Sequence, residues 1–255
     1  MDFTLDVYRQ LILTLLAQGF AFQSFAGFMQ NPANRAIILR HDIDKLPANA
    51  LKMAQLEHDL GVKGSYYFRV VPGVWNPGVM EKITALGHEL GYHYEDMAIA
   101  KGDLSKAMAH FESQLAQFRN IYPVTTICMH GSPLSRHDNR ALWQTYDYRD
   151  FGIIGEPYFD VDFTKVFYIT DTGRKWNHVG ASIRDRVDSG FDIPVNSTAH
   201  LAELAAQGKL PDQMMITVHP QRWHDRAGPW VKELVWQNVK NGVKRVGVRF
   251  GVLAG

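Results

Sequence analysis

Short apolar runs alternate with amphipathic segments along most of this chain of 255 residues. The apolar runs have the composition of strands and cover residues 35–44, 64–71, 88–94, 124–129, 151–154, 166–170, 191–195 and 214–218. The segments with helical spacing cover residues 4–18, 47–60, 77–86, 103–118, 197–208 and 226–240. This alternation indicates parallel βα units, and about seven such units favour an α/β barrel over an open sheet.

Start and stop signals support the predicted helices. Pro47 stands in the first turn of one helix and Gly61 follows its last turn, which is the usual placement of proline and glycine at helix ends. Asp103 and Ser197 are typical N-cap residues for two later helices. Because no repeat, low-complexity tract or linker interrupts the chain, we expect one domain over 1–255, with residues 1–30 as an N-terminal helical extension.

Polar residues stand at the carboxyl end of nearly every predicted strand. Asp42 and Asp44 follow the apolar run 36–39, and they share one face of the strand because they are two residues apart. Four further residues with titratable side chains end later strands: His93, His130, Asp171 and His219. In a βα barrel these strand ends meet at the active site.

Two neighbouring carboxylates need a bound cation or a shared proton, and neutral imidazole is the commonest metal ligand. The set therefore predicts a hydrolytic metal site. Each member also has a structural interpretation. Asp42 or Asp44 can cap the helix that starts at Pro47, and His93 can bond a carbonyl in the core. His130 can stabilise the turn at 131–133. His219, which Pro220 holds in extended backbone, can donate a proton or serve the structure alone.

Composition narrows the remaining possibilities. Hydrophobic residues make up 46% of the chain and charged residues 21%, which is ordinary for a soluble globular protein. The net charge of +1 gives no indication of a nucleic acid or an anionic membrane as partner. The single cysteine, Cys128, excludes an internal disulfide and a cysteine-rich zinc site. No glycine-rich dinucleotide loop is present.

The first residues lack the features of a signal peptide. Asp2 and Asp6 stand where a positive region belongs, and the apolar segment 11–16 is too short to span a bilayer. We therefore expect a cytoplasmic protein without a membrane span. The sequence carries no indication of its oligomeric state.

From about residue 35 to 240 the chain resembles the NodB-like polysaccharide deacetylase family. The aspartate pair matches the first motif of the family, and the lead 87–91 (Gly-His-Glu-Leu-Gly) followed by His93 matches the second. Asp171, Arg174 and Trp176 are similar to the fourth motif, and His219 to the last. The resemblance implies a distorted (β/α)7 barrel that removes acetyl groups from N-acetylated sugars with one divalent metal ion, usually zinc.

Two positions depart from the family pattern. Met97 stands where the second ligand histidine belongs, and a thioether is a poor zinc ligand among carboxylate and imidazole partners. The third motif, an arginine before a proline, is replaced by the sequence around His130. We predict that His130 replaces the missing ligand, because it ends the neighbouring strand; Glu95 and Asp96 are the other candidates.

The resemblance also implies roles for the individual residues. Asp44, His93 and His130 hold the metal, and Asp42 is the general base. His219 is the general acid. The supporting residues are Asp171, which orients His219, Arg174, which positions Asp42, and Trp176 and Trp223, which form an apolar wall for the acetyl methyl and the sugar.

The substrate is then a polysaccharide or a precursor of one. Two alternatives remain open. The first is a metal hydrolase that acts on another amide or C–N bond on the same barrel. The second is a non-catalytic carbohydrate-binding protein that has lost the metal.

Overall fold

The computed structural model of the chain describes residues 1–133, 135–176 and 187–249. Its strands all belong to one sheet: β1 (Ala21–Gln23), β2 (Ala36–Ile43), β3 (Ser65–Phe68), β4 (Glu89–Tyr94), β5 (Ile127–Met129), β6 (Phe167–Thr170) and β7 (Gln213–Val218). The order is β5-β4-β3-β2-β7-β6, with β1 also paired to β2, and every pair is parallel. The predicted parallel α/β arrangement is therefore confirmed.

Strand β2 is the centre of the sheet. It pairs with β7 along residues 36–41, with β1 along 36–38, and with β3 along 40–43. All eight of its residues are buried. A strand covered on both faces reads as a continuous apolar run, which explains why the sequence 36–39 predicted it correctly. Asp42 and Asp44 therefore lie at the carboxyl end of the central strand of the sheet.

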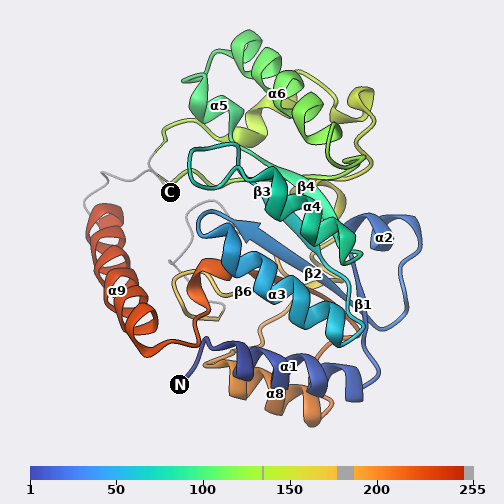
Figure 1. The fold of residues 1–255 in the computed structure, drawn as a ribbon, viewed down its shortest axis with the longest axis vertical. Helices are drawn as coiled ribbons and strands as arrows, with labels where there is room; N and C mark the ends of the chain where they lie inside the picture. Colours follow the sequence, from blue (N-terminus) through green and yellow to red (C-terminus); the bar gives the residue numbers. More distant parts are fainter. Residues whose placement is uncertain (134, 177–186, 250–255) are drawn as a thin grey trace.

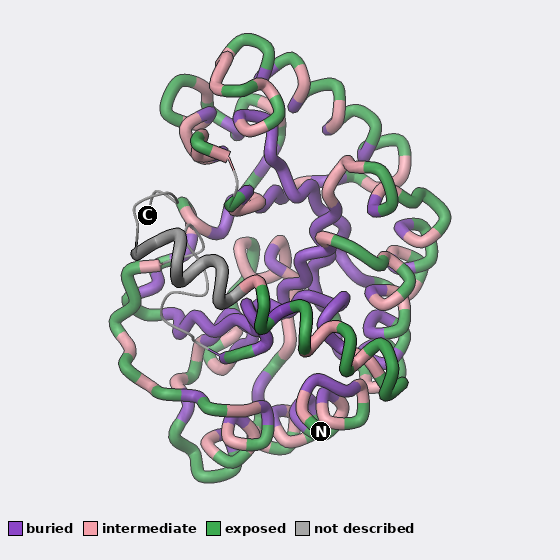
Figure 2. The backbone as a smooth tube through the Cα atoms, turned by 90° about the vertical axis from the view of Figure 1, so that its left-hand side faces the viewer, coloured by how far each residue is buried: buried purple, intermediate pink, exposed green. Residues whose placement is uncertain are grey.

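Helices cover the sheet. They are α1 (Leu5–Ala17), α2 (Phe25–Gln30), α3 (Pro47–Asp59), α4 (Pro77–Ala85), α5 (Asp96–Ile99), α6 (Leu104–Arg119), α7 (Pro157–Asp160), α8 (Thr198–Ala206) and α9 (Ala227–Arg249), with 3-10 turns η1 (Asn139–Gln144), η2 (Tyr148–Phe151) and η3 (Pro220–Arg222). Helices α3 and α4 lie in front of the central strands, and α1 lies beside α8 (Figure 1). The strands form the buried interior, while the helices expose their outward sides (Figure 2). None of the described helices combines the length and hydropathy that a membrane-spanning segment needs.

The helix end signals are confirmed. Pro47 begins α3, and Gly61 follows that helix with φ of 71°, a left-handed conformation that glycine adopts without strain. The side chains of Asp103 and Ser197 accept hydrogen bonds from the backbone N–H groups of Lys106 and His200. Helix α9 extends beyond the predicted end at 240.

The sheet curls into a half-barrel, and no ladder joins its edge strands β5 and β6 within the described residues. Two predicted strands on this side are wrong. Segment 151–154 begins at the last residue of the turn η2 and contains Gly152 at φ of 71°. Among the described residues it joins no ladder, and a single bridge, between Thr126 and Gly155, follows it. Segment 191–195 has no ladder partner among the described residues and includes Pro194, which lacks a backbone donor.

The N-terminal segment 1–30 is more than a helical extension. Its strand β1 is part of the sheet, and Phe25, at the start of α2, is fully buried. Three residues are too few to show a strand period, which is why the sequence pattern missed β1.

Candidate metal centre

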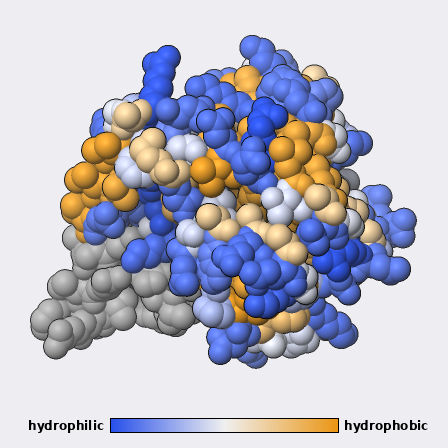
Figure 3. Space-filling model, turned by 90° about the horizontal axis from the view of Figure 1, so that it is seen from below, coloured by the Kyte–Doolittle hydropathy of each residue, from blue (hydrophilic) through white to orange (hydrophobic). Residues whose placement is uncertain are grey.

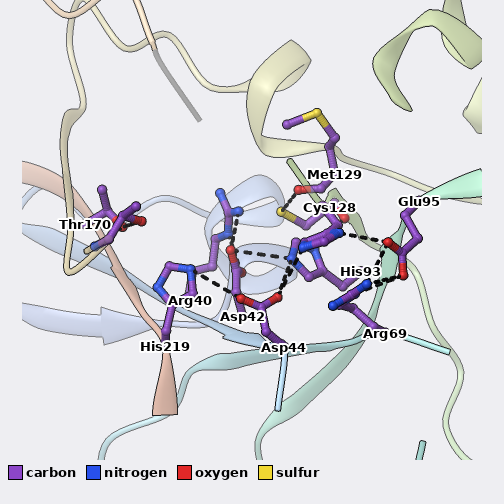
Figure 4. Close-up of polar contacts among 12 residues, drawn as sticks. Arg40, Asp42, Asp44, Arg69, His93, Glu95, Cys128, Met129, Thr170 and His219 are labelled. Atoms are coloured by element: carbon purple, nitrogen blue, oxygen red, sulfur yellow. Dashed lines mark hydrogen bonds and ion pairs between the residues drawn. The ribbon is translucent and has the colours of Figure 1, made fainter. Parts of the chain in front are cut away.

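Five of the predicted site residues collect at the carboxyl ends of four strands, and Figure 4 shows the centre of this site. Asp42 lies in β2 and Asp44 directly follows it, His93 lies in β4, and His130 and His219 follow β5 and β7. These strands are neighbours in the order β5-β4-β3-β2-β7, so the parallel sheet brings all five side chains to one edge.

Three of these side chains converge on one point. The Nε2 atoms of His93 and His130 lie 3.7 Å and 3.5 Å from Oδ1 of Asp44. One possible ligand atom from each of the three residues lies within 4.8 Å of the other two. Two ligands about 2.1 Å from a tetrahedral zinc ion are roughly 3.4 Å apart, so the spacing is close to that of a metal site.

Hydrogen bonds fix the tautomer of both rings. Nδ1 of His93 lies 2.9 Å from the carbonyl oxygen of Cys128, and Nδ1 of His130 lies 2.9 Å from Oε2 of Glu95. Both partners are acceptors, so each Nδ1 carries the proton and each Nε2 of a neutral ring keeps its lone pair. Burial lowers the pKa of His93 to about 4, which keeps that ring neutral.

Asp44 supplies the third lone pair. Its Oδ1 is buried and has no hydrogen-bond donor among the described residues. Its Oδ2 accepts a hydrogen bond of 3.2 Å from Nε2 of Gln221, a contact that the sequence did not indicate. Oδ1 of Asp44 and the two Nε2 lone pairs are all acceptors, so none of them can donate a hydrogen bond to another. A cation bound between them would satisfy the buried oxygen. The residues present therefore fit a divalent metal ion with one oxygen and two nitrogen ligands.

Glu95 does not belong to the ligand trio, but its carboxylate orients one of the ligands, His130. Besides His130, its carboxylate binds the Arg69 guanidinium at distances of 2.7 to 2.9 Å. Burial raises the pKa of Glu95, but His130 and Arg69 outweigh burial and bring the pKa to about 2. The carboxylate is thus ionised and orients the His130 ring.

The other two candidate positions point away from the site. The carboxylate of Asp96 accepts from the Tyr92 hydroxyl and contacts Nδ1 of His110. Met97 packs into the hydrophobic core with 5% of its surface exposed. Helix α5 begins at Asp96, so the chain turns inward where the family pattern places a ligand.

Asp42 is paired with an arginine from its own strand. Nε and an Nη atom of Arg40 lie 2.8 Å and 2.7 Å from the two carboxylate oxygens of Asp42, and both side chains are buried. Burial raises the pKa of the Asp42 carboxyl, but the effect of Arg40 is in the opposite direction, and the net shift of the pKa is downward. A second group of possible ligand atoms joins Asp42 to His93 and Cys128.

The role expected for Arg174 is wrong. Its guanidinium stacks over the rings of Phe3 and Trp230 and donates to the Trp230 carbonyl. Arg40 takes its place beside Asp42. The signal was the spacing, because residues 40 and 42 share one face of β2.

His219 and Asp171 form a buried pair. Nδ1 of His219 lies 2.6 Å from Oδ1 of Asp171, and Nε2 lies 4.0 Å from Oδ2 of Asp44. Asp171 also accepts hydrogen bonds of 2.7 Å from Arg222 and from the indole N–H of Trp223. Burial raises the pKa of Asp171, but Arg222 and His219 bring it below its usual value. The ionised carboxylate aims Nε2 of His219 toward the metal centre.

The two tryptophans are buried in the hydrophobic core and are not presented at the metal centre. Trp176 and Trp223 are only 3% and 2% exposed, and they pack with Phe3 in the hydrophobic core. Their indole N–H groups donate to Thr198 and Asp171. Trp223 therefore supports the His219 pair from behind, and the predicted apolar wall is wrong at both positions.

Comparisons with family models, curated proteins and solved structures found no match to this chain. What the site does is therefore inferred from its own geometry. The structure brings Asp42, Asp44, His93, His130 and His219 together, with Asp171 behind them.

Proposed function

We propose that this protein is a metal-dependent hydrolase that removes an N-acetyl group from an amino sugar, on a distorted barrel of the NodB-like type. The observation that carries the proposal is the unbonded Oδ1 of Asp44, which faces two imidazole lone pairs between Asp42 and the His219–Asp171 pair. A carboxylate, a cation site and an oriented histidine are the three parts that amide hydrolysis requires.

The ligand residues fit a zinc-type ion. Asp44, His93 and His130 would hold such an ion, which would supply a Lewis acid for the amide carbonyl and would lower the pKa of a water toward neutrality. The carbonyl of Cys128 and the carboxylate of Glu95 hold the two rings in the tautomer that binding requires.

Asp42 is the proposed general base. The paired guanidinium of Arg40 keeps its carboxylate ionised and fixes its orientation. Its Oδ2 lies 3.8 Å from Nε2 of His93, so it borders the metal position without belonging to the trio around Asp44. It can take the proton of the attacking water.

His219 is the proposed general acid. Its Nε2 lies on the Asp44 side of the site, and its Nδ1 is held by Asp171. A histidine fixed in this way can give a proton to the leaving nitrogen as the C–N bond breaks. The products are acetate and a free amino sugar.

Metal analysis combined with an acetate-release assay tests the proposal. Protein purified without chelator should contain about one divalent ion per chain and should release acetate from N-acetylated sugars or oligosaccharides. Chelation should abolish the activity, and zinc should restore it. A metal-loaded protein that releases nothing from these substrates but cleaves another C–N bond would contradict the acetyl-sugar assignment. A protein that binds sugars but no metal would contradict the enzyme itself.

A further inference from the structure

Helix α9 leaves an apolar face uncovered beside a cavity. Val231, Val235, Trp236 and Val239 are each 50% to 57% exposed, and at 100° per residue they fall within an arc of about 140° on the helix. Gln237, in contrast, is only 6% exposed. A helix on a globular protein normally buries its whole apolar side, but this one leaves these four residues largely exposed.

The exposed face of α9 lies beside a cavity and another exposed apolar residue, Leu46. Helix α9 stands at one side of the molecule in Figure 1, and Figure 3 shows an apolar patch on that same side. A cavity of about 1160 Å³ separates α9 from the start of α3, and Leu46, Val235 and Trp236 are among its lining residues. Leu46 is itself 50% exposed. We call Leu46, Val231, Val235, Trp236 and Val239 the α9 surface.

Charge is segregated onto the same segment. Residues 226–249 contain six basic residues and one acidic residue, a net charge of +5. The whole chain has 27 basic and 26 acidic residues, so the rest of it carries −4. The overall charge of +1 therefore conceals a strongly basic helix on an acidic body. Lys240, whose Nζ lies 5.2 Å from the centre of the Trp236 ring, lies beside the apolar face.

We infer that the α9 surface docks onto an anionic lipid bilayer. An apolar helix face combined with basic residues and a tryptophan is the pattern of a helix that lies in the membrane interface. A symmetric pairing of two copies through α9 would oppose two segments of +5 each, whereas an anionic leaflet complements them. Leu46 is two residues from Asp44, so the docked surface adjoins the segment that carries this metal ligand.

Vesicle sedimentation of the full-length protein tests this inference without an activity assay. Vesicles of phosphatidylcholine with about 30% phosphatidylglycerol should bind the protein at low salt, and phosphatidylcholine alone should bind it at least tenfold less. Replacing Lys232 and Lys240 by Gln should weaken binding by roughly fivefold for each charge removed.

The apolar contribution is tested with the exposed valines. The double variant Val235→Asp, Val239→Asp should abolish binding while the protein stays folded, since both side chains are mostly exposed. Leu13→Asp is the matched control, because Leu13 on α1 is a 41% exposed apolar residue outside the α9 surface, and it should bind normally. Equal binding to both vesicle types, or no binding to either, overturns the inference. So does a dimer in solution that the valine variant dissociates, since the surface then belongs to a second copy.

Discussion

At the scale of single residues, the Arg40–Asp42 pair sets the properties of the proposed base. Both side chains are buried and doubly hydrogen-bonded, so removing either charge leaves the other unpaired in the interior. Breaking a buried pair in this way typically costs about 3–5 kcal/mol. Catalytic and structural effects at this position therefore have to be separated.

We predict that Asp42→Asn lowers turnover by a factor of roughly 10²–10⁴ and leaves metal affinity nearly intact, because the base is not a ligand. Its free energy of unfolding should fall by about 3 kcal/mol as Arg40 loses its charged partner. The double variant Arg40→Gln, Asp42→Asn should recover much of this stability without recovering activity. Metal content, denaturant unfolding and acetate release measure the three effects. If Asp42→Asn lost its metal as completely as Asp44→Asn, the two aspartates would have the opposite roles.

We predict that His219→Ala slows the release of an amine leaving group by roughly 10²–10⁴. The loss should be far smaller for an acetanilide with a strongly electron-withdrawing ring, because such a leaving group departs without full protonation. Metal content should not change, since Nε2 of His219 lies outside the trio around Asp44. An equal loss of rate on both substrates would assign His219 to a structural role instead.

The Glu95 carboxylate orients a ligand without contacting the metal position. We predict that Glu95→Gln weakens zinc affinity by about 10–100-fold, because the His130 ring loses its charged acceptor. Asp96→Asn is the matched control at the neighbouring carboxylate, which binds Tyr92 and His110 instead. Competition with a chromogenic chelator measures both affinities. A larger loss for the Asp96 variant would show that α5, rather than the Glu95 hydrogen bond, places the ligand.

At the scale of secondary-structure elements, a buried carboxylate joins α7 to β5. Glu156 caps α7 through the backbone N–H of Tyr158 and accepts from the N–H of Met129. Burial raises its pKa to about 7, against the hydrogen bonds and Arg40 that lower it. Because the folded-state pKa lies above the unfolded value of 4.5, the folded state binds more protons between these values, and stability falls as pH rises through this window.

A shift of this size corresponds to about 3 kcal/mol between pH 4 and pH 8. We predict that metal-free Glu156→Gln gains about this much relative to the wild type across the window, whatever its absolute stability, because the amide does not titrate. Urea unfolding at a series of pH values gives the difference directly. A difference that stays constant with pH would mean that Glu156 has the same pKa in the folded and the unfolded protein.

At the scale of the whole molecule, the sequence pattern predicted the elements around β2 and failed in one segment after β5 and one after β6. The buried strands β2, β4 and β7 are apolar runs, and α3, α6 and α8 carry recognisable end signals. The failures, 151–154 and 191–195, are segments without ladders among the described residues. Their apolar residues fill the core from irregular backbone, for example Ile153 and Val195, so the composition resembled a strand.

The site residues fall into the same two groups, those at strand ends and those in irregular segments. Residues at strand ends, such as Asp44 and His130, could be placed from sequence because parallel strands bring their ends together. Trp176, Trp223 and Arg174 follow β6 and β7 in irregular loops, where sequence spacing does not determine direction. Arg40 was missed because a charged residue inside a fully buried strand is rarely expected. The segregated charge of α9 was hidden by a net charge summed over the whole chain.

The central claim is that Asp44, His93 and His130 bind one divalent metal ion. Zinc titration of the chelator-stripped protein by calorimetry tests it most directly, with His130→Ala as the informative variant and Met97→Leu as the control in the hydrophobic core. We predict one site per chain in the wild type, a loss of at least 100-fold in affinity for His130→Ala, and no change for Met97→Leu. Wild-type affinity in His130→Ala, or no zinc site in the wild type, would contradict the account.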